Sequence, residues 1–447
     1  MKIAIIGAGF TGLSAALALS KNNHEITVFE KDEYPGGLAM GYKESLWNWG
    51  LEKYYHHWFT NDKNAISLAR EIRCEIVTKR PKTSVIADNH IYKFDSFFDV
   101  LTFPKLNMPD KLRMASVLGL LRYNPFWKPL EKVKAVDFLQ RTMGNKAYSL
   151  LWEPQLKNKF GRYADDISLC WFWARIKKRT FSLSYPKGGF LEFAQKLVSE
   201  IKKRNGEFYF NTEVTEIRNV NHSGKRGTSA SRILIRCWTS QSQHDGKEVK
   251  SKEQKFYFDK VIVTLPSFLF LKIAPQLPED YRRRLQNLKG LGALNLILRL
   301  RQPFLKDGTY WLSVCNKNAP VMAVVEHTNF MDKKYYNNEH IVYLGNYLPN
   351  NHPYMKMSAN ELLKVYDPFL RKINQNYQLS IINYQLFKAP FAQPIISNNY
   401  SQLMPPFETP LKNVYLANIQ QVYPWDRGTN YAIELGEKIA KIISRHC

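Results

Sequence analysis

The sequence predicts an α/β fold, and two observations carry that prediction. In the first thirty residues, an apolar, β-branched run (2–6) is followed by a glycine-rich turn, a stretch of helix formers (13–19) and a second apolar run (26–29). A strand, a glycine turn, a helix and a strand in this order are typical of a nucleotide-binding βαβ unit. The chain also has 447 residues, of which 45% are hydrophobic. That length and composition allow a large core and two or three domains.

Six residues form the glycine turn: Gly7, Ala8, Gly9, Phe10, Thr11 and Gly12. Gly7 permits a tight turn out of the strand, Gly9 leaves room for a pyrophosphate at the backbone, and Gly12 lets the helix pack closely on the sheet. The unpaired N–H groups at the helix N-terminus attract phosphate. Glu30 ends the second strand, where a carboxylate accepts hydrogen bonds from a ribose and repels a 2′-phosphate. We therefore predict a dinucleotide site that disfavours NADP.

Composition limits the classes of protein that fit. No apolar run approaches the ~20 residues of a membrane-spanning helix, and the first strand begins at residue 2, so we expect no signal peptide. Five single cysteines predict no metal site and are typical of the reducing cytoplasm. The formal net charge of +25 suits an anionic partner. We expect no nucleic-acid partner, because the sequence has no helix-turn-helix, zinc-finger or RNA-binding motif.

A glycine pair follows the second strand closely. Gly36 and Gly37 come after Glu30 and Lys31, and they give the backbone a second place to press against a cofactor. Together these residues resemble the second FAD motif of the flavoproteins that include amine oxidases, protoporphyrinogen oxidases, phytoene desaturases and UDP-galactopyranose mutases. The resemblance implies that the cofactor is FAD. Many members have an arginine where this sequence has Leu38, so the sequence departs from the family at that contact.

Two later segments resemble further motifs of the same family. The stretch 185–217 is similar to the return of the chain to the FAD domain, which implies that the backbone of Val214 contacts the adenine. Asn418 stands where many members have an aspartate that binds the ribityl chain. The last FAD motif is matched by Asp426, Gly428, Thr429 and Asn430. These residues precede a predicted helix (431–444), whose N-terminus would stabilise the negative charge of a reduced flavin.

The resemblance covers nearly the whole chain and implies how it is divided. We expect an FAD-binding Rossmann-like domain that is discontinuous in sequence, with an inserted α+β substrate domain. The expected FAD-binding segments are 1–79, 185–266 and 411–447. The expected substrate segments are 80–184 and 267–410.

Residues 46–62 are dense in aromatic side chains and contain His56 and His57. In the family the matching segment runs beside the isoalloxazine ring, and the two histidines with residues 60–62 look most like the mutases. We interpret this segment as a wall of the flavin pocket and His56 or His57 as the catalytic group that supplies a hydrogen bond near the reactive edge. The alternative is a core aromatic cluster with satisfied histidines.

Two enzymatic functions remain open at this point. The first is an FAD-dependent oxidoreductase of the amine oxidase and protoporphyrinogen oxidase type, in which the flavin accepts hydride from a small-molecule substrate. The second is a UDP-sugar mutase-like isomerase without net redox change. The histidine segment and the positive charge favour the isomerase, but no arginine pair for the diphosphate stands out in the sequence. The sequence does not predict an oligomeric state.

A third hypothesis adds a peripheral membrane association, at the inner face of a membrane. Met114, Val117, Leu118 and Leu121 form an apolar stripe at helical spacing, beside basic residues and the aromatic pair 126–127. A helix of this kind can lie on an anionic lipid surface. Protoporphyrinogen oxidases and desaturases dock on membranes through this part of the chain, and the resemblance extends that expectation to this protein. The alternative is a helix packed on its own domain.

Overall fold

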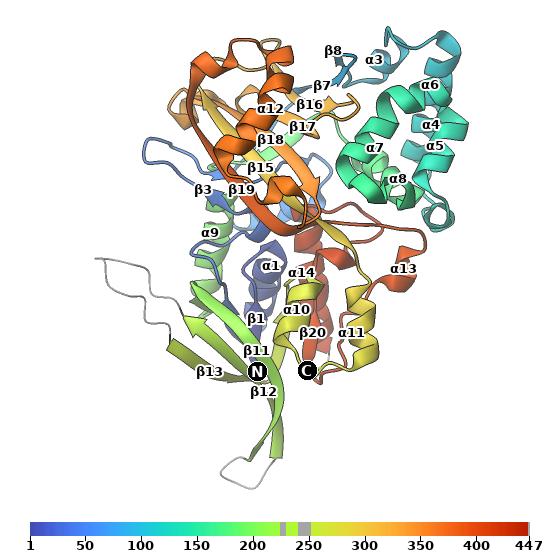
Figure 1. Ribbon diagram of the computed structural model, residues 1–447. Coiled ribbons are helices and arrows are strands. Elements are labelled where there is room, and N and C mark those ends of the chain that lie inside the picture. The colour runs from blue at the N-terminus through green and yellow to red at the C-terminus, as the bar shows by residue number, and fades with distance from the viewer. Residues whose placement is uncertain (224–228, 240–251, 446–447) are drawn as a thin grey trace.

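The computed structural model describes residues 1–223, 229–239 and 252–445. Figure 1 shows two parts that lie one above the other. The lower part is built on a parallel sheet, and the upper part combines a mixed sheet with a group of helices. Within the described ranges, no helix has both the length and the apolar composition that crossing a bilayer requires.

Five parallel strands form the lower sheet, in the order β10-β2-β1-β14-β20. Their bounds are β1 (Lys2–Ile6), β2 (Glu25–Phe29), β10 (Glu207–Tyr209), β14 (Lys260–Val263) and β20 (Val414–Leu416). The sheet therefore joins residues from both ends and the middle of the chain. It confirms the predicted α/β class, with a Rossmann-like sheet assembled from separate segments.

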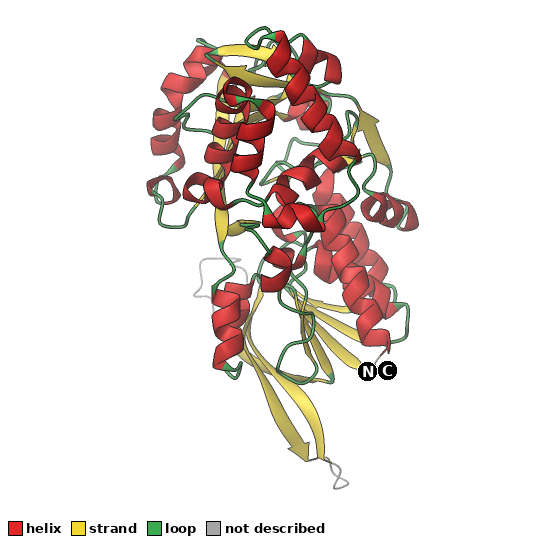
Figure 2. Cartoon of the chain, turned by 90° about the vertical axis from the view of Figure 1, so that its right-hand side faces the viewer, coloured by secondary structure: helices red, strands yellow, loops and turns green. Residues whose placement is uncertain are grey.

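Alternate residues of these strands face two different cores, because side chains alternate across a sheet. Ile3 and Ile5 of β1 belong to a core shared with helices, which cover one face of the sheet (Figure 2). The helices are α1 (Phe10–Ser20), α2 (Lys63–Glu71), α9 (Gly189–Lys202) and α14 (Thr429–Arg445). Ala4 and Ile6 belong to another core, shared with an antiparallel sheet. Its strands are β11 (Thr212–Ser223), β12 (Ser229–Thr239) and β13 (Lys252–Phe258).

A seven-stranded mixed sheet forms the base of the upper part, in the order β19-β15-β18-β17-β16-β7-β8. The strands are β7 (Lys82–Ala87), β8 (His90–Lys93), β15 (Gly290–Leu300), β16 (Thr309–Val314), β17 (Ala323–Glu326), β18 (His340–Leu348) and β19 (Ile381–Pro394). Helix α12 (Ala359–Ile373) packs on it through a separate apolar core.

The remaining elements are shorter or lie in the helical group of the upper part. The helical group contains α3 (Phe97–Leu101), α4 (Met108–Tyr123), α5 (Ala135–Met143), α6 (Asn145–Ala147), α7 (Glu153–Phe160) and α8 (Leu169–Lys178). The other helices are α10 (Ser267–Ile273), α11 (Glu279–Gln286) and α13 (Tyr400–Leu403). Short strands are β3 (Gly41–Tyr42), β4 (Leu51–Glu52), β5 (Trp58–Phe59), β6 (Ile76–Lys79) and β9 (Leu183–Pro186).

The apolar stripe of α4 is packed within its own domain. Met114 and Leu121 are fully buried, and Val117 and Leu118 pack against the same core. The helix contacts α5 and α8 along this face. Met114 and Leu121 therefore pack in their own domain, as the alternative predicts, and Val117 and Leu118 are half-buried against it. Burial decides this point because an amphipathic helix can turn the same apolar face to lipid or to protein.

The C-terminal helix packs against α1 at backbone distance. A Cβ on Gly436 would lie 2.0 Å from Ser14 Oγ and 2.3 Å from the Thr11 carbonyl oxygen. Ser14 Oγ also donates a hydrogen bond of 3.1 Å to the carbonyl of Ile433. The first helix is equally tight on its sheet, since a Cβ on Gly12 would lie 2.0 Å from the Gly7 carbonyl oxygen. The close packing predicted for Gly12 is thus confirmed.

Two glycines in helix interiors should respond in opposite ways to the same substitution. Gly436→Ala should destabilise the protein by about 1–3 kcal/mol, because the new methyl group must push α1 and α14 apart. Gly119→Ala in α4 should stabilise it by up to ~1 kcal/mol, because nothing lies within 4 Å of the added Cβ and alanine favours a helix. Urea unfolding of the two variants measures both effects. A Gly436→Ala protein as stable as the wild type would contradict the tight helix contact.

Candidate functional site

The glycine turn and the glycine pair lie side by side. The Gly36 N–H donates to the Ala8 carbonyl at 2.9 Å, and a Cβ on Gly37 would lie 3.1 Å from Gly9 Cα. Helix α1 begins at Phe10, and no side chain caps its N-terminus. An uncapped helix N-terminus beside two glycines is typical of a phosphate-binding site.

The other residues of the turn support its shape. The ring of Phe10 stacks on Phe193 with centroids 5.3 Å apart, so its side chain belongs to the core and only its backbone faces the turn. Thr11 is buried, Lys31 is exposed, and Leu38 is half-buried against the neighbouring core. Leu38 therefore offers packing and no charge at this position.

Glu30 is a buried carboxylate next to this turn. Its Oε2 accepts a hydrogen bond of 2.7 Å from the Ala8 N–H, and its Oε1 accepts one of 3.1 Å from the Asp32 N–H. Burial raises its pKa, and the two N–H donors act against that shift. A carboxylate offers about four acceptor positions, so two remain for ribose hydroxyls. The Glu30 carbonyl accepts from the Thr212 N–H at 2.8 Å, which brings the start of β11, and with it Val214, close to Glu30.

The side chain of Asn418 is buried and hydrogen-bonded within its own chain. Its Nδ2 donates to the Leu265 carbonyl at 3.0 Å, and its Oδ1 accepts from the Gln420 N–H at 3.0 Å. The side chain thus joins the end of β20 to the connection between β14 and α10. Its contact with a ribityl chain stays a prediction.

The last predicted motif forms hydrogen bonds with the segment 56–65, which contains both histidines. Thr429 Oγ1 accepts a hydrogen bond of 2.7 Å from Trp58 Nε1, and Asn430 Oδ1 accepts one of 3.1 Å from the Ala65 N–H. Both bonds span more than 360 residues of sequence. A Cβ on Gly428 would meet only Tyr431, at 3.8 Å. The N-terminus of α14 and the segment 56–65 are therefore held as one unit.

A buried carboxyl group anchors the other end of the histidine segment. Both oxygens of Glu52 accept from the Tyr185 hydroxyl, at 2.9 and 2.7 Å, and Oε1 also accepts from the Phe190 N–H at 2.8 Å. Full burial raises the pKa of Glu52 to about 7. The Tyr343 hydroxyl donates to the Glu52 carbonyl at 2.8 Å. Strand β4 is thereby fixed to α9 and β18 four residues before His56.

His56 and His57 are neutral groups in this structure. His56 Nδ1 lies 2.6 Å from the Tyr54 carbonyl, and because a carbonyl only accepts, Nδ1 carries the proton and Nε2 has a free lone pair. Burial lowers the pKa of His56 to about 4. His57 Nδ1 lies 3.1 Å from the Tyr310 hydroxyl, and burial lowers its pKa to about 3. Near neutral pH, both rings exchange hydrogen bonds without carrying charge.

Sequence reasoning missed a group of cations beside the last motif. Asp426 accepts from Trp171 Nε1 at 3.0 Å and from Arg175 Nη1 at 3.3 Å, so it faces α8 and not the glycine turn. Arg427, the next residue in the motif, donates to Gln393 Oε1 at 3.0 Å. Lys159 of α7 lies beside them and is buried. A lysine inside an otherwise buried aromatic stretch is the sequence signal that could have identified it.

The residues present fit a dinucleotide. A Cβ on Gly9 would meet only Gly37 Cα, at 3.8 Å, so the turn leaves open the space that a phosphate needs. Glu30 provides acceptors for a ribose, and the uncapped N-terminus of α1 provides donors. In the part of the chain that the structure describes, no group of three His, Cys, Asp or Glu side chains gathers.

Known proteins resemble this chain in sequence or in fold. Coproporphyrinogen III oxidase from Staphylococcus aureus is 28% identical over 315 residues, which are 62% of this chain and 64% of that protein. The chain thus matches less than two thirds of that relative. Two solved structures share the fold: cyclohexylamine oxidase from Brevibacterium oxydans (TM-score 0.73, 14% identity, 100% and 99% of the two chains) and reduced UDP-galactopyranose mutase (TM-score 0.73, 14%, 100% and 94%).

The family model described as flavin containing amine oxidoreductase matches residues 10–424, which is nearly the whole chain. The match runs from the glycine turn, through the histidine segment, to the residues before the last motif. The protein therefore belongs to the flavin containing amine oxidoreductase family.

Proposed function

We propose that the protein oxidises a small molecule held against the flavin, between the histidine segment and the N-terminus of α14. Bound FAD supplies the hydride acceptor. The observation that carries the proposal is the pair of long-range hydrogen bonds, Trp58 to Thr429 and Ala65 to Asn430. These bonds hold two neutral histidines next to a helix N-terminus, and that helix end favours the negative charge of a reduced flavin.

The cofactor site extends from this point to the first helix. Phosphates would be held at the turn 7–12 and the pair 36–37, a ribose at Glu30, and the adenine along the backbone at Val214. Gly428, Thr429 and Asn430 would face the ring system. The same proposal divides the chain into FAD-binding segments 1–79, 185–266 and 411–447, with substrate segments 80–184 and 267–410.

His56 would be the hydrogen-bond acceptor at the reacting bond. Its Nε2 lone pair is free because Nδ1 donates to the Tyr54 carbonyl. The rings of Tyr55, Trp311 and Tyr343 pack around the segment. The centroid of the Tyr55 ring lies 4.9 Å from that of Trp311 and 6.0 Å from that of Tyr343. This aromatic wall would exclude water from the reacting face.

A mutase-like isomerase is the second candidate, and one observation favours it. Arg175 and Arg427 lie beside Asp426, on the side of the motif that faces α8. No arginine pair stands out in the sequence, whereas the fold brings these two together. Two arginines near the ring would suit the diphosphate of a nucleotide sugar.

Gly9→Val should abolish flavin binding while leaving the fold intact. Gly9 has φ −70° and ψ 171°, which valine adopts freely, and its new Cβ would be in ordinary contact with Gly37 Cα at 3.8 Å. That side chain would fill the place of a phosphate. The ratio of flavin to protein absorbance after purification measures the loss, with circular dichroism as the check on folding and Gly119→Val as the matched control. A folded Gly9→Val protein that purifies yellow contradicts the proposed phosphate site.

Flavin reduction distinguishes the two candidate functions. We expect anaerobic loss of flavin absorbance with coproporphyrinogen III, at a rate that His56→Leu lowers about 100-fold, and putrescine serves as the comparison compound that tests for an amine substrate. Because the pKa of His56 is lowered to about 4, the rate should stay level from about pH 8 to 5.5 and fall only as the pH approaches 4.

The control for this experiment is His90→Leu, since His90 is exposed and lies on β8. A transition near the ordinary histidine pKa, or no effect of His56→Leu, would contradict the role of His56. Conversion of UDP-galactopyranose by the reduced protein, without consumption of an oxidant, would establish the isomerase instead.

We also propose a peripheral membrane surface on α3 and α4, distinct from the stripe that the sequence indicated. Apolar side chains that are more than half exposed gather there: Phe97, Phe98, Met108, Leu112, Leu120, Tyr123 and, just beyond α4, Phe126. The four on α4 occupy the face opposite the buried stripe. Exposed apolar groups in such number mark an interaction surface, and the neighbouring Lys111 and Lys128 favour an anionic lipid.

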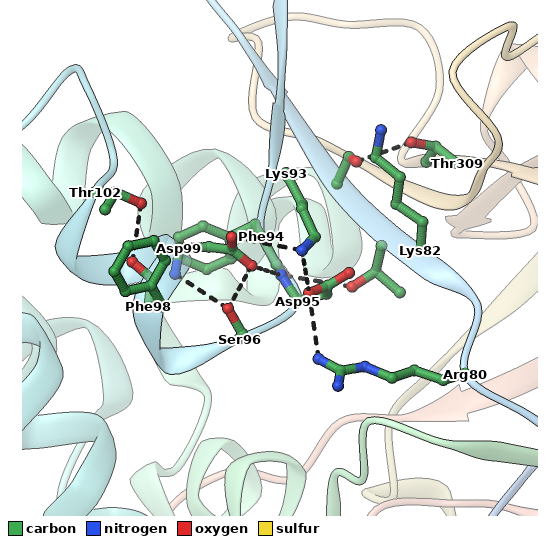
Figure 3. Close-up of polar contacts among 12 residues, drawn as sticks. Arg80, Lys82, Lys93, Phe94, Asp95, Ser96, Phe98, Asp99, Thr102 and Thr309 are labelled. Carbon is green, nitrogen blue, oxygen red and sulfur yellow. Dashed lines mark hydrogen bonds and ion pairs between the residues drawn. The ribbon is translucent and has the colours of Figure 1, made fainter.

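Polar contacts hold α3 in the position that exposes Phe98 (Figure 3). Ser96 Oγ accepts from the Asp99 N–H at 3.2 Å and donates to Asp99 Oδ2 at 2.7 Å, which caps the helix. Asp95 pairs with Lys93 at 3.4 Å and with Arg80 at 3.8 Å. The protein would then act in the cytoplasm, at the inner face of a membrane.

Leu120→Glu should weaken binding to phosphatidylglycerol vesicles about tenfold, because it removes an apolar group and adds a charge of the same sign as the lipid. Vesicle flotation measures the bound fraction. The matched control is Leu379→Glu, since Leu379 is 83% exposed but lies far from α4 in the sequence, after α12. Equal effects of the two variants, or no flotation of the wild type at low salt, would contradict this surface.

A further inference from the structure

Three basic side chains converge on two aromatic rings above the last motif. Lys159 Nζ lies 4.8 Å from the ring centroid of Tyr347 and 5.4 Å from that of Trp171. The guanidinium of Arg427 lies 4.7 Å from the Tyr347 ring, and that of Arg175 lies 5.1 Å from the Trp171 ring. Helix α7, helix α8 and the turn before α14 each contribute one cation, and β18 contributes Tyr347.

The carboxylate that faces this group is Asp426. It pairs with Arg175 at 3.3 Å and also accepts from Trp171 Nε1. In the ranges that the structure covers, neither Lys159 nor Arg427 forms an ion pair; Arg427 instead donates to Gln393 and to the Tyr347 hydroxyl. Three cations against one carboxylate leave this group with an excess of positive charge.

Lys159 shows this excess most clearly. Only 8% of its surface is exposed, and within the described residues its ammonium group forms no hydrogen bond. Burial, together with repulsion from Arg175 and Arg427, lowers the pKa of Lys159 well below its ordinary value. Burying an unpaired ammonium group destabilises a protein. Such a group is explained where a ligand brings the missing negative charge.

The cations also lie within electrostatic reach of the proposed reaction site. The charge of Arg427 contributes to lowering the pKa of His56, and the charges of Arg179 and Arg175 do so for His57. Arg427 stands two residues before Thr429, which binds Trp58 beside these histidines. An anion held by the three cations would therefore border the histidine segment.

We propose that Lys159, Arg175 and Arg427 bind an anionic group of the substrate, a carboxylate or a phosphate. This inference rests on the proposed function, because it assumes that the substrate lies beside His56. Arginine binds either group through two parallel N–H donors, and lysine adds a point charge. The same cations repel an ammonium group, so a simple diamine is a poor ligand for this site.

The test uses the flavin-loaded protein with three probes: inorganic pyrophosphate, citrate and putrescine. Calorimetry and the change in the flavin spectrum report binding without any turnover. We expect pyrophosphate or citrate to bind and putrescine not to bind. Tighter binding of pyrophosphate identifies a phosphate-bearing substrate, and tighter binding of citrate identifies a carboxylate-bearing one.

Two variants remove one charge each from the site. Lys159→Met and Arg427→Gln should each weaken anion binding at least tenfold, as expected for the loss of a charge-assisted hydrogen bond. The matched control is Lys157→Met on the same helix, since Lys157 is 58% exposed and pairs with Glu153. The melting temperature of Lys159→Met should equal or exceed that of the control, because methionine removes a buried, unpaired charge. A structural role for Lys159 predicts a lower melting temperature instead.

The inference is overturned if neither anion binds at up to about 10 mM, or if Lys157→Met weakens binding as much as Lys159→Met. Its failure can be told apart from failure of the proposed function. If anions bind but no compound reduces the flavin, the proposed function fails and the anion site stands. If a cationic amine reduces the flavin and neither anion binds, the anion site fails and the proposed function stands.

Discussion

The backbone contact between α1 and α14 is the constraint on which the site depends. Gly436 has no side chain, so α14 can approach Ser14 and Thr11 closely enough for Ser14 Oγ to reach the Ile433 carbonyl. This contact fixes the axis of α14, and its first turn then meets Trp58 and Ala65. The glycine turn, the histidine segment and the last motif are therefore positioned together, although they are separated by hundreds of residues. A shift of one helix would displace all three.

The site combines two electrostatic environments that differ in purpose. Around the histidines, burial lowers both pKa values far enough that the rings stay neutral, which suits groups that exchange hydrogen bonds beside an uncharged reacting bond. Beside the last motif, the three cations Arg175, Arg427 and Lys159 face a single carboxylate, Asp426, which pairs with Arg175. One end of a substrate would meet neutral acceptors and the other a positive field.

Two features could be predicted only in part from the sequence. The stripe of Met114, Val117, Leu118 and Leu121 was correctly identified as one face of a helix, but its periodicity could not tell whether protein or lipid covers that face. The structure covers it with α5 and α8 and exposes the opposite face. Asn418 was identified from its place in a motif, whereas the structure gives both polar atoms of its side chain partners within the chain. In each case one partner lies far away in the sequence, on α8 for the stripe and at Leu265 for Asn418.

By itself, the sequence determined the βαβ unit, the α/β class and the FAD motifs, because these depend on local order: strand, glycine turn, helix and acid follow one another within thirty residues. The glycines of these motifs are informative because a larger residue would clash. A Cβ on Gly12 would lie only 2.0 Å from the Gly7 carbonyl oxygen. Only the tertiary structure decided the protonated nitrogen of His56, the gathering of Lys159, Arg175 and Arg427, and which face of α4 is exposed. The last two are set by contacts between segments far apart in the chain, and such contacts leave no periodic signal in the sequence. The proton of His56 is set by the local backbone, which brings the Tyr54 carbonyl to Nδ1.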